Sequence, residues 1–170
     1  MNPGQAAENA SLYGMEEERA ALIYEKYEIQ LAKQDGLDFD DLLLKGLELV
    51  RRDREGARRW VDRFEHVLVD EYQDTNDLQY NFVRLLAEAH GNLAVCGDPD
   101  QSIYRWRGAD IGNILRFEQD FPGTRVIRLE KNYRSVGNVL KAAQHVIQNN
   151  RSRKQKDLVT DREDGEPLLL

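Results

Sequence analysis

The most constraining feature of this sequence is an alternation of short apolar runs with a helical segment in the middle of the chain. The runs HVLVD (residues 66–70) and NLAVCGD (residues 92–98) flank the segment NDLQYNFVRLLAEAH (residues 76–90). Short, continuous, β-branched runs are typical of strands that a parallel sheet covers on both faces. We therefore predict a right-handed strand–helix–strand unit with both strands buried.

The helix in this unit is predicted from its first turn and from its periodicity. Asn76 and Gln79 stand at the spacing of a capping box, in which each side chain accepts a hydrogen bond from the other residue's backbone. Apolar residues recur on one helical face at Leu78, Phe82, Leu85 and Leu86.

The flanking segments continue the α/β pattern. Before the unit we predict a helix over residues 16–34, a Leu-rich helix within 36–53 and a short helix over 55–64. After it we predict a helix near 111–121, a strand over 125–129 and a helix over 135–150.

Composition excludes several classes of protein. A net charge of −7 over 170 residues argues against a nucleic-acid binder that relies on a global positive field. No run reaches the roughly 18 apolar residues of a membrane helix, and the N-terminus shows no signal pattern, so we expect a cytoplasmic protein. The lone cysteine, Cys96, is expected to be a small core residue on the second strand.

Two acids, Asp70 and Glu71, follow the first strand directly. Ligands of open parallel sheets gather at the carboxyl ends of the strands. An aspartate there can hold Mg²⁺ and a neighbouring glutamate can polarise an attacking water. The alternative, a strand that meets a polar turn, stays open from this segment alone.

The second strand leads into a segment rich in amide, aromatic and cationic side chains. The amide of Gln101 can sense a γ-phosphate because it both donates and accepts hydrogen bonds. Tyr104 and Trp106 alternate with Arg105 and Arg107, a pattern that suits single-stranded nucleic acid, whose bases stack on aromatic rings. Two core aromatics in a tight turn are the alternative.

A third candidate segment, RLEKNYRS, covers residues 128–135. Tyr133 can stack on a base and Arg134 can reach a phosphate as an arginine finger. The alternative is a packing tyrosine beside a surface charge.

Taken together and in order, DFDDLL, VLVDEYQDT, GDPDQSIYRWRGA and LEKNYRS resemble the UvrD/Rep/PcrA family of superfamily-one DNA helicases. The resemblance runs from about Met15 to the end of the chain. It implies a motor with two RecA-like lobes that close on ATP and move 3′ to 5′ along single-stranded DNA.

The resemblance implies roles around the nucleotide. By matching position, Asp70 is the Mg²⁺ ligand and Glu71 the general base that orients the water. Gln101 resembles the γ-phosphate sensor, Tyr133 the residue stacked on adenine, and Arg134 the arginine finger. ATP and Mg²⁺ are the implied cofactors.

The resemblance also implies partners. Tyr104 and Trp106 resemble the aromatic residues that stack on DNA bases. Arg107 resembles a cation of the same motif that is either structural or at the DNA face. Single-stranded DNA and duplex junctions are the implied partners, and no membrane is involved.

The pattern GxxxxGK[ST] of a phosphate-binding loop does not occur in the 170 residues. We therefore expect a partial RecA-like P-loop NTPase lobe preceded by a helical subdomain segment. The expected divisions are the end of a helical insertion subdomain (1–37), the second half of the first lobe (38–130), and the junction with the start of the second lobe (131–170).

On this basis the isolated chain is expected to be inactive, although its parent would be an ATP-dependent helicase. Two alternatives remain. The chain could be a binding module without ATPase activity that holds single-stranded DNA or a protein partner. It could also be the motor segment of a helicase–nuclease of the RecB/AddA type.

Overall fold

The computed structural model describes residues 15–52, 54–150 and 156–169 of the chain. The chain divides into two compact units, Met1–Ala57 and Arg58–Leu170. No helix in the described part is both long and apolar enough to cross a membrane.

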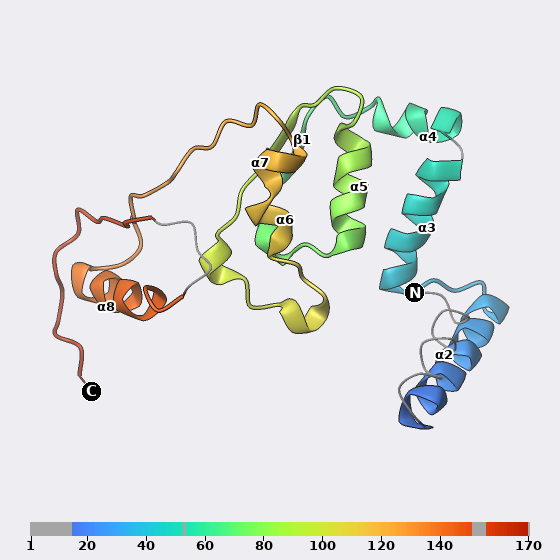
Figure 1. The fold of residues 1–170 in the computed structure, drawn as a ribbon, viewed down its shortest axis with the longest axis horizontal. Coiled ribbons are helices and arrows are strands. Elements are labelled where there is room, and N and C mark those ends of the chain that lie inside the picture. Colours follow the sequence, from blue (N-terminus) through green and yellow to red (C-terminus); the bar gives the residue numbers. More distant parts are fainter. Residues whose placement is uncertain (1–14, 53, 151–155, 170) are drawn as a thin grey trace. The chain divides into compact units, whose positions relative to one another are not determined.

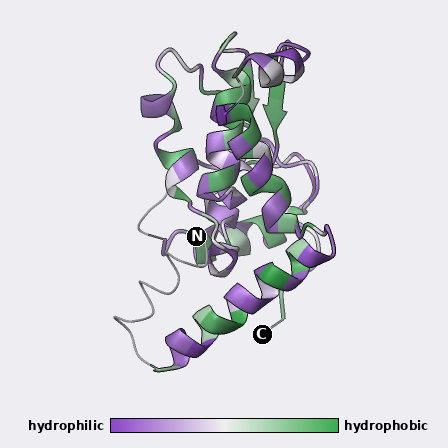
Figure 2. Cartoon of the chain, turned by 90° about the vertical axis from the view of Figure 1, so that its right-hand side faces the viewer, coloured by the Kyte–Doolittle hydropathy of each residue, from purple (hydrophilic) through white to green (hydrophobic). Residues whose placement is uncertain are grey.

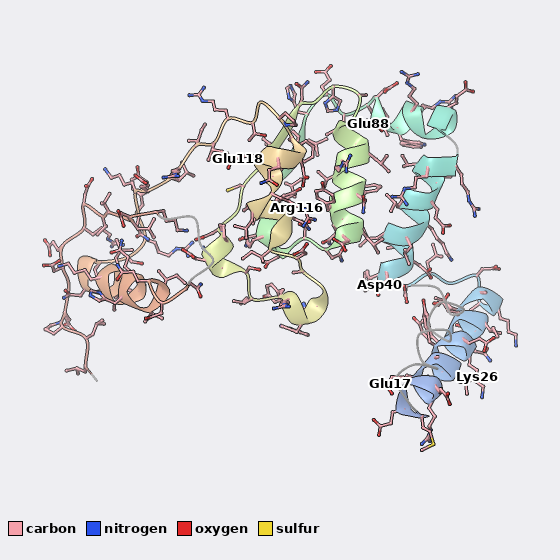
Figure 3. The ribbon with its side chains drawn as sticks, viewed as in Figure 1. Glu17, Lys26, Asp40, Glu88, Arg116 and Glu118 are labelled. Atoms are coloured by element: carbon pink, nitrogen blue, oxygen red, sulfur yellow. The ribbon has the colours of Figure 1, made fainter. Side chains whose placement is uncertain are left out.

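The first unit contains α2 (Met15–Lys33) and α3 (Phe39–Arg52), as predicted (Figure 1). Charged side chains of α2, such as Glu17 and Lys26, are exposed (Figure 3). The short helix α4 (Arg54–Val61) follows and leads into the second unit.

A reciprocal pair of side-chain bonds starts α3. The Asp41 amide donates to Asp38 Oδ1 over 2.8 Å, and the Asp38 amide donates to Asp41 Oδ2 over 3.4 Å. The Tyr27 hydroxyl of α2 also donates to Asp38, over 2.9 Å, so this capping turn is bonded to α2. Free amides of a first helical turn need such acceptors.

The second unit is built on the predicted strand–helix–strand motif. The strand β1 (Val67–Val69) is followed by α5 (Asp77–Ala87) and β2 (Leu93–Val95). The two strands pair in parallel with Leu68 opposite Ala94, which confirms the predicted pairing (Figure 1).

The predicted capping box at the start of α5 is confirmed. The Gln79 amide donates to Asn76 Oδ1 over 2.9 Å, and the Asn76 amide donates to Gln79 Oε1 over 3.0 Å. A cap of this kind contributes about 1 kcal/mol, and it fixes where the chain leaves the turn after β1.

The core of the second unit lies against one face of the sheet. Its centre is formed by Tyr72, Tyr80 and Phe117, with the Tyr72 and Phe117 rings edge to face at 5.3 Å. The strands contribute Val69, Leu93 and Val95. Figure 2 shows apolar residues running through the strands.

The prediction that both strands are buried on both faces is wrong. Leu68 is 77% exposed, and Ala94 and Cys96 are exposed as well, so Cys96 is not a core residue. Successive strand residues point to opposite faces, and the helices among the described residues cover only the face that carries Val69 and Val95.

The predicted helix over 111–121 is broken in two. It forms α6 (Gly112–Leu115) and α7 (Phe117–Asp120), separated at Arg116, whose φ of −93° and ψ of 2° leave the helical region. The Arg116 side chain bonds to residues on both sides of the break, as described below, so these polar contacts hold the local bend.

The predicted strand over 125–129 is absent from the described structure. Val126, Ile127 and Leu129 are exposed, and no neighbouring strand pairs with them in the described ranges. A parallel bridge instead joins Lys131 to Val159. The last helix, α8 (Gly137–Ile147), confirms the helix predicted for that region.

Candidate functional site

The acidic pair stands where β1 ends and the chain turns sharply. Glu71 has φ 50° and ψ 42°, a left-handed conformation that costs a non-glycine residue of order 1 kcal/mol. The Glu71 amide donates to Asp70 Oδ1 over 2.9 Å. Both acids are exposed, so their carboxylates are accessible to a ligand.

The turn continues as a 3₁₀ segment, η1 (Tyr72–Asp74), that is bonded to the second strand. The Cys96 amide donates to the Val69 carbonyl over 2.8 Å, and the Tyr72 amide donates to the Cys96 carbonyl over 3.0 Å. The parallel pairing therefore extends past both strands, and it brings the exit of β1 next to the exit of β2.

Gln73, within η1, contacts Glu71, although no sequence pattern singles it out. Its side chain is buried, and its Nε2 donates to Glu71 Oε2 over 2.8 Å and to Asp74 Oδ2 over 3.3 Å. Its Oε1 accepts from the Asp98 amide over 2.9 Å. A single polar residue in a turn carries no periodicity signal, so only the tertiary structure reveals its contacts.

The exit of β2 forms a second 3₁₀ segment, η2 (Pro99–Gln101), capped by Asp98. The Asp100 amide donates to Asp98 Oδ1 over 3.0 Å, and Gln101 Nε2 donates to Asp98 Oδ2 over 2.8 Å. Gln101 is exposed. Asp98 therefore holds the side-chain amide of Gln101 at the same sheet edge as Glu71.

Asp98 also forms an ion pair with Lys156. Burial alone would raise the pKa of Asp98, but hydrogen bonds from Lys156, Gln101 and the Asp100 amide outweigh it and hold that pKa below its usual value. The capping carboxylate is thus kept charged.

Gly97 permits the close approach of the two exits. A Cβ atom at this position would lie 2.7 Å from Gln73 Oε1 and 2.8 Å from Ile114 Cδ1. Both distances are far below ordinary van der Waals contact, so a side chain here would displace the side chain of Gln73 or that of Ile114 on α6.

The aromatic and cationic residues gather on a third 3₁₀ segment, η3 (Arg105–Arg107). The Tyr104 and Trp106 ring centroids lie 6.4 Å apart, and Trp106 is 74% exposed. Gly108, with φ 86°, ends the segment. Both rings stand at the surface, so the alternative that they are core aromatics is wrong.

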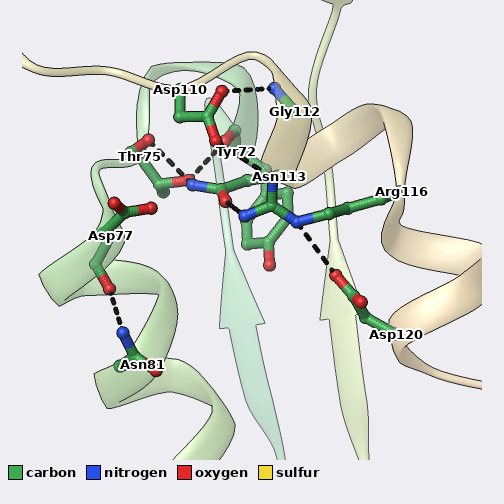
Figure 4. Close-up of polar contacts among 9 residues, drawn as sticks. All are labelled: Tyr72, Thr75, Asp77, Asn81, Asp110, Gly112, Asn113, Arg116 and Asp120. Carbon is green, nitrogen blue, oxygen red and sulfur yellow. Dashed lines mark hydrogen bonds and ion pairs between the residues drawn. The ribbon is translucent and has the colours of Figure 1, made fainter.

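A polar network centred on the buried residues Asn113 and Thr75 anchors the end of this segment to the turn after β1 (Figure 4). Asn113 Nδ2 donates to the Thr75 carbonyl over 3.0 Å, and the Asp110 amide donates to the same carbonyl over 3.0 Å. Arg116 donates to Asn113 Oδ1 over 2.6 Å and pairs with Asp110 over 3.0 Å and Asp120 over 3.3 Å.

The network also sets the charge state of Asp110. The Gly112 amide and the Arg116 guanidinium, in that order, stabilise the carboxylate and hold the pKa of Asp110 below its usual value. This carboxylate thus fixes the start of α6 and the break at Arg116 together.

The third candidate segment lies next to α8. Tyr133 is exposed, with the Lys131 ammonium 5.5 Å from its ring centroid, and Arg134 is exposed with its amide bonded to Asn132 Oδ1 over 3.0 Å. The carbonyl of Arg134 accepts from Arg162. These contacts join residues 131–134 to one another and to Arg162. None of them reaches Asp70 or Glu71.

In the described part of the chain, no three histidine, cysteine, aspartate or glutamate side chains converge as a metal site. Mg²⁺ commonly binds through one or two carboxylates together with waters and substrate phosphates. The exposed carboxylate of Asp70 fits a ligand of that kind.

Residues 2–122 match the family model of the UvrD/REP helicase N-terminal domain, and residues 127–170 match that of the UvrD-like helicase C-terminal domain. The chain is 50% identical over 151 residues to a probable DNA helicase II homolog of Rickettsia conorii, covering 89% of this chain and 23% of that protein. It is 46% identical over 166 residues to the ATP-dependent DNA helicase PcrA of Staphylococcus aureus, covering 98% of this chain and 22% of that protein. The chain thus spans less than a quarter of the length of these relatives.

Proposed function

Because the chain belongs to the UvrD-like helicase family, we propose that it is part of an ATP-dependent DNA helicase. In this proposal the parent protein couples Mg-ATP hydrolysis to 3′-to-5′ movement along single-stranded DNA and to duplex unwinding. The observation that carries the proposal is the parallel pairing of β1 and β2, which brings Glu71 and Gln101 to one sheet edge.

In this proposal the chain contains parts of both RecA-like lobes of the motor. Residues 38–130 form the second half of the first RecA-like lobe, preceded by the end of a helical insertion subdomain in 1–37. Residues 131–170 form the junction and the start of the second lobe. The parallel pair and the family models that meet near residue 125 support this division.

At the nucleotide, Asp70 would hold the Mg²⁺ ion, whose charge offsets that of the phosphates. Glu71 accepts a hydrogen bond from the attacking water and orients it. Gln101, held by Asp98, hydrogen-bonds the γ-phosphate. Tyr133 stacks on adenine and Arg134 places its guanidinium on the phosphates when the two lobes close. The exposure of all five side chains supports these roles.

At the DNA, Tyr104 and Trp106 stack on bases and Arg107 supplies positive charge close to the backbone. The exposed rings and the adjacent guanidinium support this role. Single-stranded DNA next to a duplex junction is the proposed substrate.

The 170-residue chain on its own should not hydrolyse ATP, because the phosphate-binding pattern GxxxxGK[ST] does not occur in it. A second candidate function for the isolated chain is therefore binding of single-stranded DNA. The exposed turn at Tyr104–Arg107 favours it, because its geometry rests on contacts within the chain.

The test is carried out on the full-length protein that contains this chain. ATP turnover is measured with and without single-stranded DNA, and unwinding is followed on duplexes that carry a 3′ or a 5′ tail. We expect Mg²⁺-dependent turnover that single-stranded DNA stimulates, and unwinding of the 3′-tailed duplex. Turnover indifferent to DNA, or unwinding only from a 5′ tail, would contradict the proposal.

A further inference from the structure

The polar side chain of Gln73 is almost completely buried between the two strand exits. It is 1% exposed, and its amide forms hydrogen bonds in opposite directions. One side faces Glu71 and Asp74, and the other faces the Asp98 amide. A buried amide satisfied on both sides holds its neighbours in a single arrangement.

The orientation of this amide follows from the chemistry of its partners. The Asp98 backbone amide can only donate, so it must face Gln73 Oε1. The carboxylates of Glu71 and Asp74 can only accept when charged, so they must face Nε2. If the amide were flipped so that Oε1 and Nε2 exchanged places, all of these side-chain hydrogen bonds would be lost.

The partner on the Nε2 side is an exposed glutamate on a strained turn. A glutamate side chain on the surface samples many rotamers, and ordering it costs free energy. The hydrogen bond from Gln73 Nε2 to Glu71 Oε2, at 2.8 Å, removes part of that freedom before any ligand arrives.

The partner on the Oε1 side is the loop that carries Gln101. In addition to the Asp98 bond, the Ser102 hydroxyl donates to the Gln73 carbonyl over 3.3 Å. Both ends of η2 are thus bonded to Gln73, and the missing side chain of Gly97 leaves the space for it. Gln73 is therefore held by the loop that follows β2, and its Nε2 donates to Glu71 in the turn that follows β1.

We propose that Gln73 is a positioning residue for hydrolysis, which holds the carboxylate of Glu71 in place by bracing its own amide against the Asp98 loop. This inference rests on the proposed function, because it requires Glu71 to orient the attacking water. A purely structural Gln73 would satisfy buried groups without affecting turnover.

The first test replaces side-chain amides by apolar side chains of similar shape in the full-length protein. Gln73→Met removes the bonds to Glu71 and Asp98. The matched control, Gln144→Met, removes a half-buried amide on α8 whose hydrogen bond goes to the Leu158 carbonyl. We expect Gln73→Met to lower kcat for ATP about 10- to 100-fold with KM unchanged. We expect Gln144→Met to retain the kcat of the wild type at temperatures where the variant is folded.

The second variant, Gln73→Glu, keeps an acceptor for the Asp98 amide and places a carboxylate opposite Glu71. We expect Gln73→Glu to lower kcat as well. If Gln73→Met does not fold, the kcat of Gln73→Glu tests whether Gln73 positions Glu71. In a Glu71→Gln background, Gln73→Met should cause no further fall in residual turnover, because it acts through Glu71.

The outcomes separate this inference from the proposed function. An inactive wild-type protein overturns both. A wild-type protein with DNA-stimulated turnover, together with wild-type kcat in a folded Gln73 variant, overturns only the role of Gln73. An equal loss of kcat in folded Gln144→Met also overturns it, since the effect of losing an amide would then not be specific to Gln73.

Discussion

The guanidinium carbon of Arg107 lies 4.6 Å from the centroid of the Trp106 ring. It also lies 5.6 Å from the centroid of the Tyr104 ring, so one cation contacts both aromatic side chains of the turn. Contacts of this kind stabilise a side chain by roughly 0.5–1 kcal/mol at an exposed site. Arg107 therefore helps to hold two exposed rings in place on the surface.

Replacement of Trp106 tests the DNA face. We expect Trp106→Ala in the full-length protein to weaken binding of single-stranded DNA by about 1–3 kcal/mol, because one stacking surface is lost. Fluorescence anisotropy of a labelled oligonucleotide at fixed salt measures the effect. Trp60→Ala is the control, since Trp60 is also exposed and also contacts an arginine, Arg63. Equal affinity of the two variants would contradict a DNA role for Trp106.

Replacement of Glu71 tests the catalytic assignment. Glu71→Gln keeps the shape and the left-handed backbone but removes the charge that orients the water. In the full-length protein we expect nucleotide binding to persist while kcat for ATP falls by about 10² to 10⁴. Glu88→Gln, at the exposed end of α5, should turn over ATP like the wild type. Near-normal hydrolysis by Glu71→Gln would remove Glu71 from the role of general base.

Replacement of Gly97 tests the close approach of the two strand exits. The added methyl group of Gly97→Ala would meet Gln73 Oε1 at 2.7 Å, so the loop must shift. We expect a destabilisation of about 1–3 kcal/mol, as for other overpacked sites. Native-state hydrogen exchange of the amides at Tyr72 and Asp98 reports it locally. If both amides of Gly97→Ala exchanged at the wild-type rate, the two strand exits would not be closely packed at Gly97.

The charge of Asp110 predicts a dependence of stability on pH. Its pKa is held below the ordinary value of 3.8, so the folded state favours the charged form. This contribution is fully present above pH 3.8 and is lost as the pH falls through the lower folded pKa. We expect Asp110→Asn to be less stable than the wild type at neutral pH, with the difference narrowing in acid. A difference in denaturation midpoint that does not change with pH would contradict this account.

The parts of the fold that were predicted correctly carry local signals. The capping box at Asn76 and Gln79 joins residues three positions apart, and the apolar period of α5 is visible in one segment. Burial of Leu68 and a strand over 125–129 were predicted wrongly, because both depend on distant partners. An apolar run indicates that a strand could be buried, but it does not show which other elements pack against its two faces.

The candidate site divides in the same way. Asp70, Glu71 and Gln101 could be selected from their places after two strands, and the structure brings their segments to one edge. Gln73 could not be selected, because its role depends on the Asp98 amide, which lies far away in sequence. The roles of these residues in hydrolysis stay predictions, and the variants of Glu71 and Gln73 test two of them.

The parallel register of β1 and β2 also bears on the order in which the second unit folds. Val67 pairs with Leu93, so all of α5 lies inside the loop that this pairing closes. Loop closure costs entropy before any strand contact offsets it, whereas the first turn of α5 is stabilised by its immediate neighbours. We expect α5 to form first and the strand pairing to limit the folding rate, so the edge that carries Glu71 and Gln101 is assembled late.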